Sequence, residues 1–141
     1  MQLVEFVTNH WPLVTSFIIL AALLGFSEFR ARRHGAKPLT PQEATRLMNK
    51  NNALLIDIRD LKSFEQGHVL NALHIPNKDV AVHPKVAASV DAPIILLCQT
   101  GFVAPASGEQ LRKRGHTQVF FVKGGIQEWQ AAGLPLTKRK S

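Results

Sequence analysis

The first thirty residues have a different hydrophobic pattern from the rest of the chain. From Phe6 to Ser27 no residue carries a formal charge, and the apolar side chains of "WPLVTSFIILAALLGF" fall on every face of a helix. A surface helix of a soluble domain is apolar on one stripe only, and about twenty helical residues cross the hydrocarbon core of a bilayer. The pattern therefore predicts a transmembrane helix over residues 6–27, preceded by a short tail of residues 1–5.

The charges on either side of this segment predict its orientation. The tail contains Glu5 and neither Lys nor Arg, whereas "RARRHGAK" after the segment carries four positive charges. Positive residues favour the cytoplasmic side of a membrane, and each contributes about 1 kcal/mol near anionic headgroups. Residues 28–38 are thus predicted to be a basic juxtamembrane linker, with everything that follows in the cytoplasm. A cleaved signal peptide is the alternative, but it requires positive charge before the apolar segment. A buried core helix would be shorter and patterned.

Beyond residue 38, short apolar runs alternate with helical segments. Thr40, Pro41 and Glu43 form a capping box with Pro at the first helical position, so a helix is predicted to begin there. Four runs have strand length and are apolar almost throughout, which indicates strands buried on both faces: residues 53–58, 71–75, 93–98 and 118–122. Further helices are predicted between and after them, at residues 60–66, 83–90, 104–114 and 125–132. This alternation predicts an α/β domain over residues 39–137, with a parallel sheet of four to five strands and helices on both faces. Residues 138–141 form a basic tail.

The net charge and the cysteine and histidine content limit the partners and cofactors that the chain is expected to have. The chain has 141 residues, a net charge of +7 and one cysteine, which excludes an intramolecular disulfide. Nine of the seventeen Lys and Arg residues fall in three short clusters with no aromatic residues interleaved, so a nucleic-acid partner is not favoured. The six histidines show no spacing typical of a metal site, which needs three or four converging ligands. No metal and no cofactor is predicted.

Two of the predicted strands end in residues that can carry chemistry. In parallel sheets, ligands bind beyond the carboxyl ends of the strands. "DIRD" (residues 57–60) ends the first strand, and "CQTGFVA" (residues 98–104) ends the third. Both motifs are therefore expected at the same edge of the sheet.

Cys98 has two interpretations. A free cysteine is often a buried filler. At the end of a strand, however, the turn around Gly101 can direct backbone N–H groups inward as an anion nest, and the following helix adds its positive end. Both effects favour a thiolate and, equally, a persulfide anion on the same sulfur. The predicted chemistry is nucleophilic: the sulfur of Cys98 accepts a sulfur atom and passes it on.

From Leu39 to Leu136 the chain resembles a single rhodanese domain. The motifs that carry the resemblance occur in the family's order and spacing: "LLIDIRD", "FEQGHVLNALHIP", "IILLCQTG" and "VFFVKGGIQEWQAAGLPL". With its apolar N-terminal segment, the whole chain is similar to the membrane-anchored single-domain rhodaneses of Gram-negative bacteria. The resemblance implies a sulfurtransferase anchored by one span in the bacterial inner membrane, with the N-terminus periplasmic and the rhodanese domain cytoplasmic.

The resemblance also implies roles for individual residues. Cys98 matches the sulfur-carrying cysteine, and the loop that wraps it supplies substrate-binding amides. Asp57 and Arg59 match an acid and a base that support this loop as an ion pair. Gly67 and His68 match a structural turn. Gly124 and Gly125 match the turn before the last helix, which Trp129 packs onto the sheet. The substrate-binding residues are Gln99, Thr100, Gly101, Phe102 and Val103.

The loop departs from the family at two positions. Active rhodaneses often carry Arg directly after the cysteine and Arg or Thr four residues later, where this chain has Gln99 and Val103. Thiosulfate, a small dianion, is expected to bind weakly without these cations, so a protein or glutathione persulfide is an alternative donor. Phosphatases of similar topology need an Arg six residues after the cysteine, where this chain has Ala104.

Two functions follow from the sequence. In the first, Cys98 transfers sulfane sulfur to an external thiol such as thioredoxin, glutathione or a client protein, since the chain has no second cysteine to resolve the persulfide. In the second, the altered loop has lost turnover and the domain is a docking module for a membrane or cytoplasmic protein.

Overall fold

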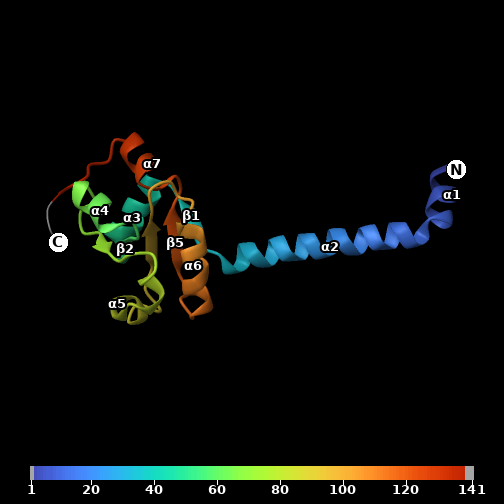
Figure 1. Cartoon of the computed structure of the whole chain (residues 1–141), viewed down its shortest axis with the longest axis horizontal. Coiled ribbons are helices and arrows are strands. Elements are labelled where there is room, and N and C mark those ends of the chain that lie inside the picture. The colour runs from blue at the N-terminus through green and yellow to red at the C-terminus, as the bar shows by residue number, and fades with distance from the viewer. Residues whose placement is uncertain (1, 139–141) are drawn as a thin grey trace. The chain divides into compact units, whose positions relative to one another are not determined.

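The computed structural model describes residues 2–138, and for residues 31–34 it describes the backbone alone (Figure 1). Residues up to His34 form one compact unit, and those from Gly35 onward form a second. The predicted tail of residues 138–141 lies outside the described residues apart from Lys138.

The N-terminal unit consists of two helices, α1 (Gln2–Asn9) and α2 (Trp11–His34). They meet at His10, whose carbonyl accepts hydrogen bonds from the amides of Leu13 and Val14. Pro12 lies in the first turn of α2, where its missing N–H leaves no bond unmade. The apolar pattern did not predict this interruption at His10. The linker predicted from residue 28 onward is also wrong in its first part, because the chain is helical as far as His34.

Helix α2 contains a segment that could cross a membrane. By length and composition Trp11–Arg30 qualifies, with a mean hydropathy of 1.8 and none of its residues buried. Apart from the partly buried Val14, its large apolar side chains are 55–72% exposed in the structure. Such a helix is either a membrane anchor or a signal sequence.

The second unit is built on a parallel sheet of five strands in the order β1-β5-β4-β2-β3. The strands are β1 (Lys37–Leu39), β2 (Leu54–Asp57), β3 (Leu73–His74), β4 (Ile94–Leu97) and β5 (Val119–Val122). The helices of this unit are α3 (Pro41–Asn51), α4 (Leu61–Gln66), the 3₁₀ turn η1 (Val80–Val82), α5 (Pro84–Ala87), α6 (Ala104–Lys113) and α7 (Gly125–Ala131). The predicted α/β class and parallel sheet are confirmed.

Helices cover both faces of the sheet, as predicted. The central strand β4 is fully buried, and its alternate side chains enter two separate cores. Ile94 and Leu96 pack with residues from η1, α5 and α6, whereas Ile95 and Leu97 pack with residues from α3, α4 and α7. Burial on both faces explains why this strand is a continuous apolar run.

The helix predicted after Thr40 has the predicted cap. The side-chain oxygen of Thr40 accepts a hydrogen bond from the Glu43 amide at 3.2 Å, and the Glu43 carboxylate accepts one from the Thr40 amide at 2.9 Å. Leu39, Ala44 and Leu47 belong to the core that contains Ile95 and Leu97.

Strand β1 was missed within the predicted linker. "KPL" is only three residues long and largely exposed, so it carries no apolar signal. Its pairing with β5 places it in the sheet, and the Lys123 amide donates to the Leu39 carbonyl at 2.8 Å.

Candidate active site

The two predicted motifs meet at one edge of the sheet. Strands β2 and β4 are adjacent and parallel, with Asp57 paired in register with Leu97. Cys98 follows directly after β4, and Arg59 follows β2 by two residues. Because the carboxyl ends of parallel strands lie together, the cysteine and the acid–base pair come together as expected.

The Cys98 sulfur is nearly buried but is held by the loop. Cys98 is 4% exposed, and it packs beside Ile56, Ile58 and Ala104. The amide of Gly101 donates a hydrogen bond to Sγ at 3.0 Å. The loop therefore directs one of its backbone donors at the sulfur. The sulfur is therefore both part of the core and the acceptor of a hydrogen bond from the loop.

The first turn of α7 sets the orientation of the loop peptides. The amide of Ile126 donates to the Cys98 carbonyl at 2.9 Å, and the amide of Gln127 donates to the Gln99 carbonyl at 3.3 Å. These amides are the otherwise unpaired donors of a helix N-terminus. Since a trans peptide points its C=O and the next N–H in opposite directions, the amides of Gln99 and Thr100 point away from α7.

Glycines make this close approach possible. Gly125 has φ +62°, and a Cβ placed there would lie 2.3 Å from the Cys98 carbonyl oxygen. Gly101 has φ +81°, and its Cβ would lie 2.7 Å from the Gly124 nitrogen. The cysteine loop and the Gly124–Gly125 turn are therefore packed backbone against backbone.

Asp57 and Arg59 form a buried ion pair. Arg59 Nη2 lies 2.7 Å from Asp57 Oδ2, and Arg59 Nε lies 3.0 Å from Oδ1. The Asp57 side chain has no exposed surface and that of Arg59 is 7% exposed. The same guanidinium donates to the Gly67 carbonyl at 2.8 Å, so the pair joins the end of β2 to the end of α4. This geometry fits the supporting role predicted for both residues.

Cys98 opens into a cavity of about 310 Å³. The cavity is lined by Ile58, Arg59, Asp60, Ser63, Cys98, Gln99 and Val103. Of the predicted binding residues, Gln99 and Val103 lie at the cavity, whereas Phe102 is 87% exposed and Thr100 is exposed. Gly101 contributes its amide to the sulfur, and Asp57 lies behind Arg59.

Asp60 and Ser63 line the cavity but were not singled out from the sequence. Asp60 is the N-cap of α4, and its carboxylate accepts hydrogen bonds from the Ser63 hydroxyl at 2.7 Å and from the Ser63 amide at 3.2 Å. The hydroxyl bond first, and then the amide bond, hold the pKa of Asp60 below its ordinary value. The spacing D-x-x-S indicates a helix cap. The position of α4 in the fold is what brings Asp60 and Ser63 to the lining of the same cavity as Cys98.

The residues predicted to be structural lie inside the domain. His68 Nδ1 lies 2.8 Å from the Phe64 carbonyl, and the two rings stack with centroids 3.9 Å apart. Because a carbonyl only accepts, Nδ1 carries the proton in this bond. Trp129 is 3% exposed and packs α7 onto the sheet.

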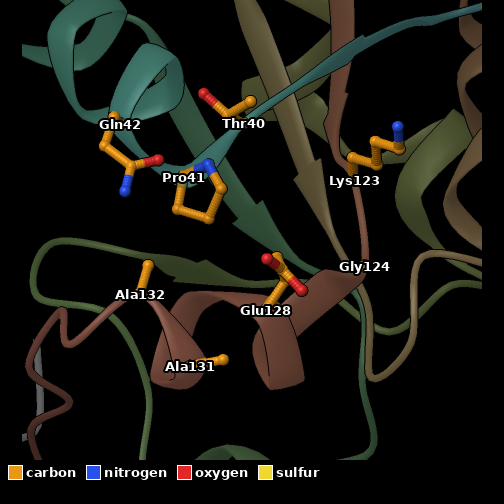
Figure 2. Close-up of a pocket in the computed structure, with 8 residues that line it drawn as sticks. All are labelled: Thr40, Pro41, Gln42, Lys123, Gly124, Glu128, Ala131 and Ala132. Atoms are coloured by element: carbon orange, nitrogen blue, oxygen red, sulfur yellow. The ribbon is translucent and has the colours of Figure 1, made fainter.

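A larger cavity of about 550 Å³ lies between the start of α3 and helix α7 (Figure 2). Figure 2 shows Pro41 and Gln42 on one side, with Glu128 and Ala132 on the other. Cys98 is absent from its lining, and its charged groups are the exposed Lys123 and Glu128. The smaller cavity is therefore the candidate active site, because Cys98 lines it. Among the side chains that the structure describes, those of residues 2–30 and 35–138, no group of three or more His, Cys, Asp or Glu converges as a metal site would require.

A cysteine held by a backbone loop at the carboxyl edge of a parallel sheet defines a class of small α/β domains that transfer groups through a thiol. Residues 40–132 match the Rhodanese-like domain, and the chain belongs to that family. The family predicted from the sequence motifs is confirmed.

Three relatives illustrate the range of similarity. The uncharacterized protein YibN of Escherichia coli is 28% identical over 141 residues, which is 99% of both chains. The thiosulfate sulfurtransferase GlpE of Vibrio cholerae is 33% identical over 93 residues, which is 66% of this chain and 87% of GlpE. A rhodanese-related protein from Thermoplasma volcanium has a solved structure with a TM-score of 0.64 and 21% identity; the match covers 73% of this chain and 99% of that one. YibN thus matches nearly the whole chain, whereas GlpE matches about two thirds of it.

Proposed function

We propose that the chain is a sulfurtransferase that carries sulfane sulfur as a persulfide on Cys98. The observation that carries the proposal is the hydrogen bond from the Gly101 amide to Sγ in a cysteine that also opens into a cavity. A purely structural cysteine needs neither a donor nor an opening. The likeness to GlpE, a thiosulfate sulfurtransferase, supports the same chemistry.

The reaction runs in two balanced steps. In the first, the Cys98 thiolate attacks the outer sulfur of a donor persulfide R–S–S⁻; a new S–S bond forms on Cys98, and R–S⁻ leaves with the electron pair of the broken bond. In the second, an acceptor thiolate attacks the outer sulfur of the Cys98 persulfide, and Sγ takes back the electron pair. Both anionic forms of Cys98 benefit from the same amide donor.

The cavity favours a persulfide over thiosulfate as the donor. Residues 99–103 contain neither Lys nor Arg, and the charge of Arg59 is already matched by Asp57 at 2.7 Å. A dianion therefore finds no free cation beside Cys98. Because Cys98 is the only cysteine in the chain, the acceptor is a thiol of another molecule.

Helix α2 is proposed to anchor the protein in the bacterial inner membrane. The apolar segment Trp11–Arg30 is long enough to span a bilayer, and Arg30 stands at its end. The excess of positive charge after the segment supports a periplasmic N-terminus and a cytoplasmic rhodanese domain. Adding two Arg residues beside Glu5 should weaken or invert the orientation of a C-terminal reporter. A reporter that is already periplasmic in the unaltered chain would contradict this topology.

Mass spectrometry tests the sulfur-carrier proposal. After exposure to inorganic polysulfide, the full chain in detergent micelles should gain the mass of about one sulfur atom on Cys98, and cyanide or a thiol should remove it. Cys98→Ser should gain nothing, and Glu109→Ala, whose residue lies outside the cavity lining, should load like the unaltered chain. A Cys98 that stays unmodified with polysulfide, thiosulfate and glutathione persulfide would favour the alternative function.

The alternative is a docking module with little turnover. The absence of the family's cations at Gln99 and Val103 favours it, and so does the 87% exposure of Phe102 in the loop. A membrane or cytoplasmic protein would then contact the loop without sulfur transfer. This second function would be supported by two results together: the unaltered chain does not load with sulfur, and Cys98→Ser still binds the partner.

A further inference from the structure

The charge at the mouth of the Cys98 cavity is negative. Arg59 lines the cavity and is paired with Asp57 behind it, so the group of Asp57, Arg59 and Asp60 carries a net charge of −1, and Asp60 is its exposed carboxylate. Asp60 is exposed, and its bonds to Ser63 keep it ionised. The neighbouring Lys62 is exposed on α4 but does not line the cavity. A ligand that approaches the sulfur therefore passes a carboxylate.

Two exposed apolar residues, Leu61 and Phe102, adjoin the lining residues in sequence and are called the rim. Leu61, which follows Asp60, is 57% exposed, and Phe102, which precedes Val103, is 87% exposed. Val103 itself is 43% exposed and lines the cavity. The two rim residues thus adjoin lining residues in sequence, Leu61 on α4 and Phe102 on the loop. A small inorganic anion gains nothing from such a rim, whereas a polypeptide can cover it.

We propose that Asp60, together with the rim of Leu61 and Phe102, selects the thiol partner of this site: a protein cysteine flanked by basic and apolar residues. The proposal rests on the sulfur-carrier function above and narrows its partner. Charge complementarity favours a basic flank and disfavours thiosulfate and glutathione, which are both anionic. It also disfavours an anionic bilayer surface as the occupant of the rim.

The electrostatic part is tested without any sulfur transfer. Cys98 of the full chain, in neutral detergent micelles at low ionic strength, is modified with a cationic and with an anionic methanethiosulfonate reagent of similar size. The ratio of the two rates is compared among three proteins: the unaltered chain, Asp60→Asn and Asp91→Asn. Asn preserves the helix cap, and Asp91 precedes β4, so it lies at the opposite edge of the sheet from Cys98.

Asp60→Asn should lower the ratio of cationic to anionic rates, with a change in rate of about threefold for each unit of reagent charge. Asp91→Asn should leave the ratio unchanged. The thiolate itself favours the cationic reagent in all three proteins, so the change in ratio is the measurement. An unchanged ratio in Asp60→Asn, or an equal fall in Asp91→Asn, would overturn the proposal. Asp60→Ser, which also retains a capping oxygen, serves as the second variant.

The rim is tested with cysteine peptides activated as 2-pyridyl disulfides, whose reaction with Cys98 releases a coloured thiopyridone. Three peptides of equal length carry Lys and Leu, Glu and Leu, or Lys and Ser beside the cysteine. The Lys–Leu peptide should react fastest. Asp60→Asn should reduce the advantage of Lys over Glu, and Phe102→Ser should reduce the advantage of Leu over Ser. Leu70→Ser is the control, because Leu70 is 57% exposed but precedes β3.

Equal rates for the three peptides, or no reaction of Cys98 with any of them, would overturn the proposed selection. Protection of Cys98 in anionic nanodiscs, with no such protection in detergent, would assign the rim to the bilayer and would also overturn it. Neither assay requires a persulfide. A chain that shows the selectivity but never loads with sulfur would therefore refute the sulfur-carrier function alone.

Discussion

The two halves of the candidate site are built by different means. The loop from Cys98 to Val103 is held by backbone: the amides of α7 hold its carbonyls, and its own Gly101 amide holds the sulfur. The Asp57–Arg59 half is held by side chains, through a bidentate ion pair that has almost no exposed surface. A loop held by its backbone tolerates changes of its side chains but not replacement of its glycines. An ion pair of side chains, in contrast, does not tolerate the loss of either partner. The following predictions test this difference.

Asp57→Ala should have the largest effect on stability. Removal of the carboxylate leaves the Arg59 guanidinium buried without its partner, which costs about 3–5 kcal/mol. Urea unfolding of the full chain in detergent measures the change, followed by Trp129 fluorescence in a Trp11→Phe background. Glu109→Ala is the control, because its ion pair with Lys113 is exposed and contributes about 0–1 kcal/mol. A loss below about 1 kcal/mol in Asp57→Ala would show that side chains do not hold this half.

Gly125→Ala should destabilise the domain by about 3 kcal/mol and slow the sulfur loading of Cys98. The added Cβ meets the Cys98 carbonyl oxygen at 2.3 Å, at a residue with φ +62°. Gly133→Ala is the matched control: its φ is +77°, but no atom lies within 4 Å of its Cβ. The control should cost about 1 kcal/mol and leave loading unchanged. Equal losses in both variants would mean that the backbone contact with the loop is unimportant.

Val103→Arg should raise kcat/KM for thiosulfate about tenfold, because it places a cation at the cavity for a dianionic donor. Phe102→Arg adds the same charge at a side chain that is 87% exposed and outside the cavity lining. Its effect should be smaller than threefold. Cyanide-dependent thiocyanate formation measures both variants. A similar gain in both would indicate general attraction and not a site at residue 103.

Gln99→Ala should have the smallest effect. Gln99 is exposed, and the loop uses its carbonyl, held by Gln127, instead of its side chain. The free energy of unfolding should change by less than about 0.5 kcal/mol, and the rate of sulfur loading by less than about twofold. A tenfold loss of loading would show that the side chain takes part in binding the donor.

Much of the domain was predictable because its signals are local. Continuous apolar runs indicated the buried strands, and Thr40 with Glu43 indicated a capped helix. β1 could not be predicted, since an exposed strand of three residues owes its existence to pairing with β5. The break at His10 was hidden because uncharged residues continue without interruption from Phe6 into α2.

The candidate site was predictable in position but not in detail. Cys98 and the Asp57–Arg59 pair were expected at one edge because they follow neighbouring strands of a parallel sheet. Which loop side chains face the cavity depends on the packing of Gly101 against Gly124, a contact between segments more than twenty residues apart. Asp60 has the sequence signal of a helix cap, and its place beside the sulfur follows from tertiary packing alone.

The hold of α7 on the cysteine loop has a consequence for biosynthesis. Ile126 and Gln127 are translated more than twenty-five residues after Cys98, at about 5–20 residues per second. A nascent chain that has exposed Cys98 but not yet the last helix has no fixed orientation for the loop peptides. The sulfur-binding pocket is thus assembled only as the ribosome completes the domain, and a chain truncated before residue 126 would be translated without ever acquiring it.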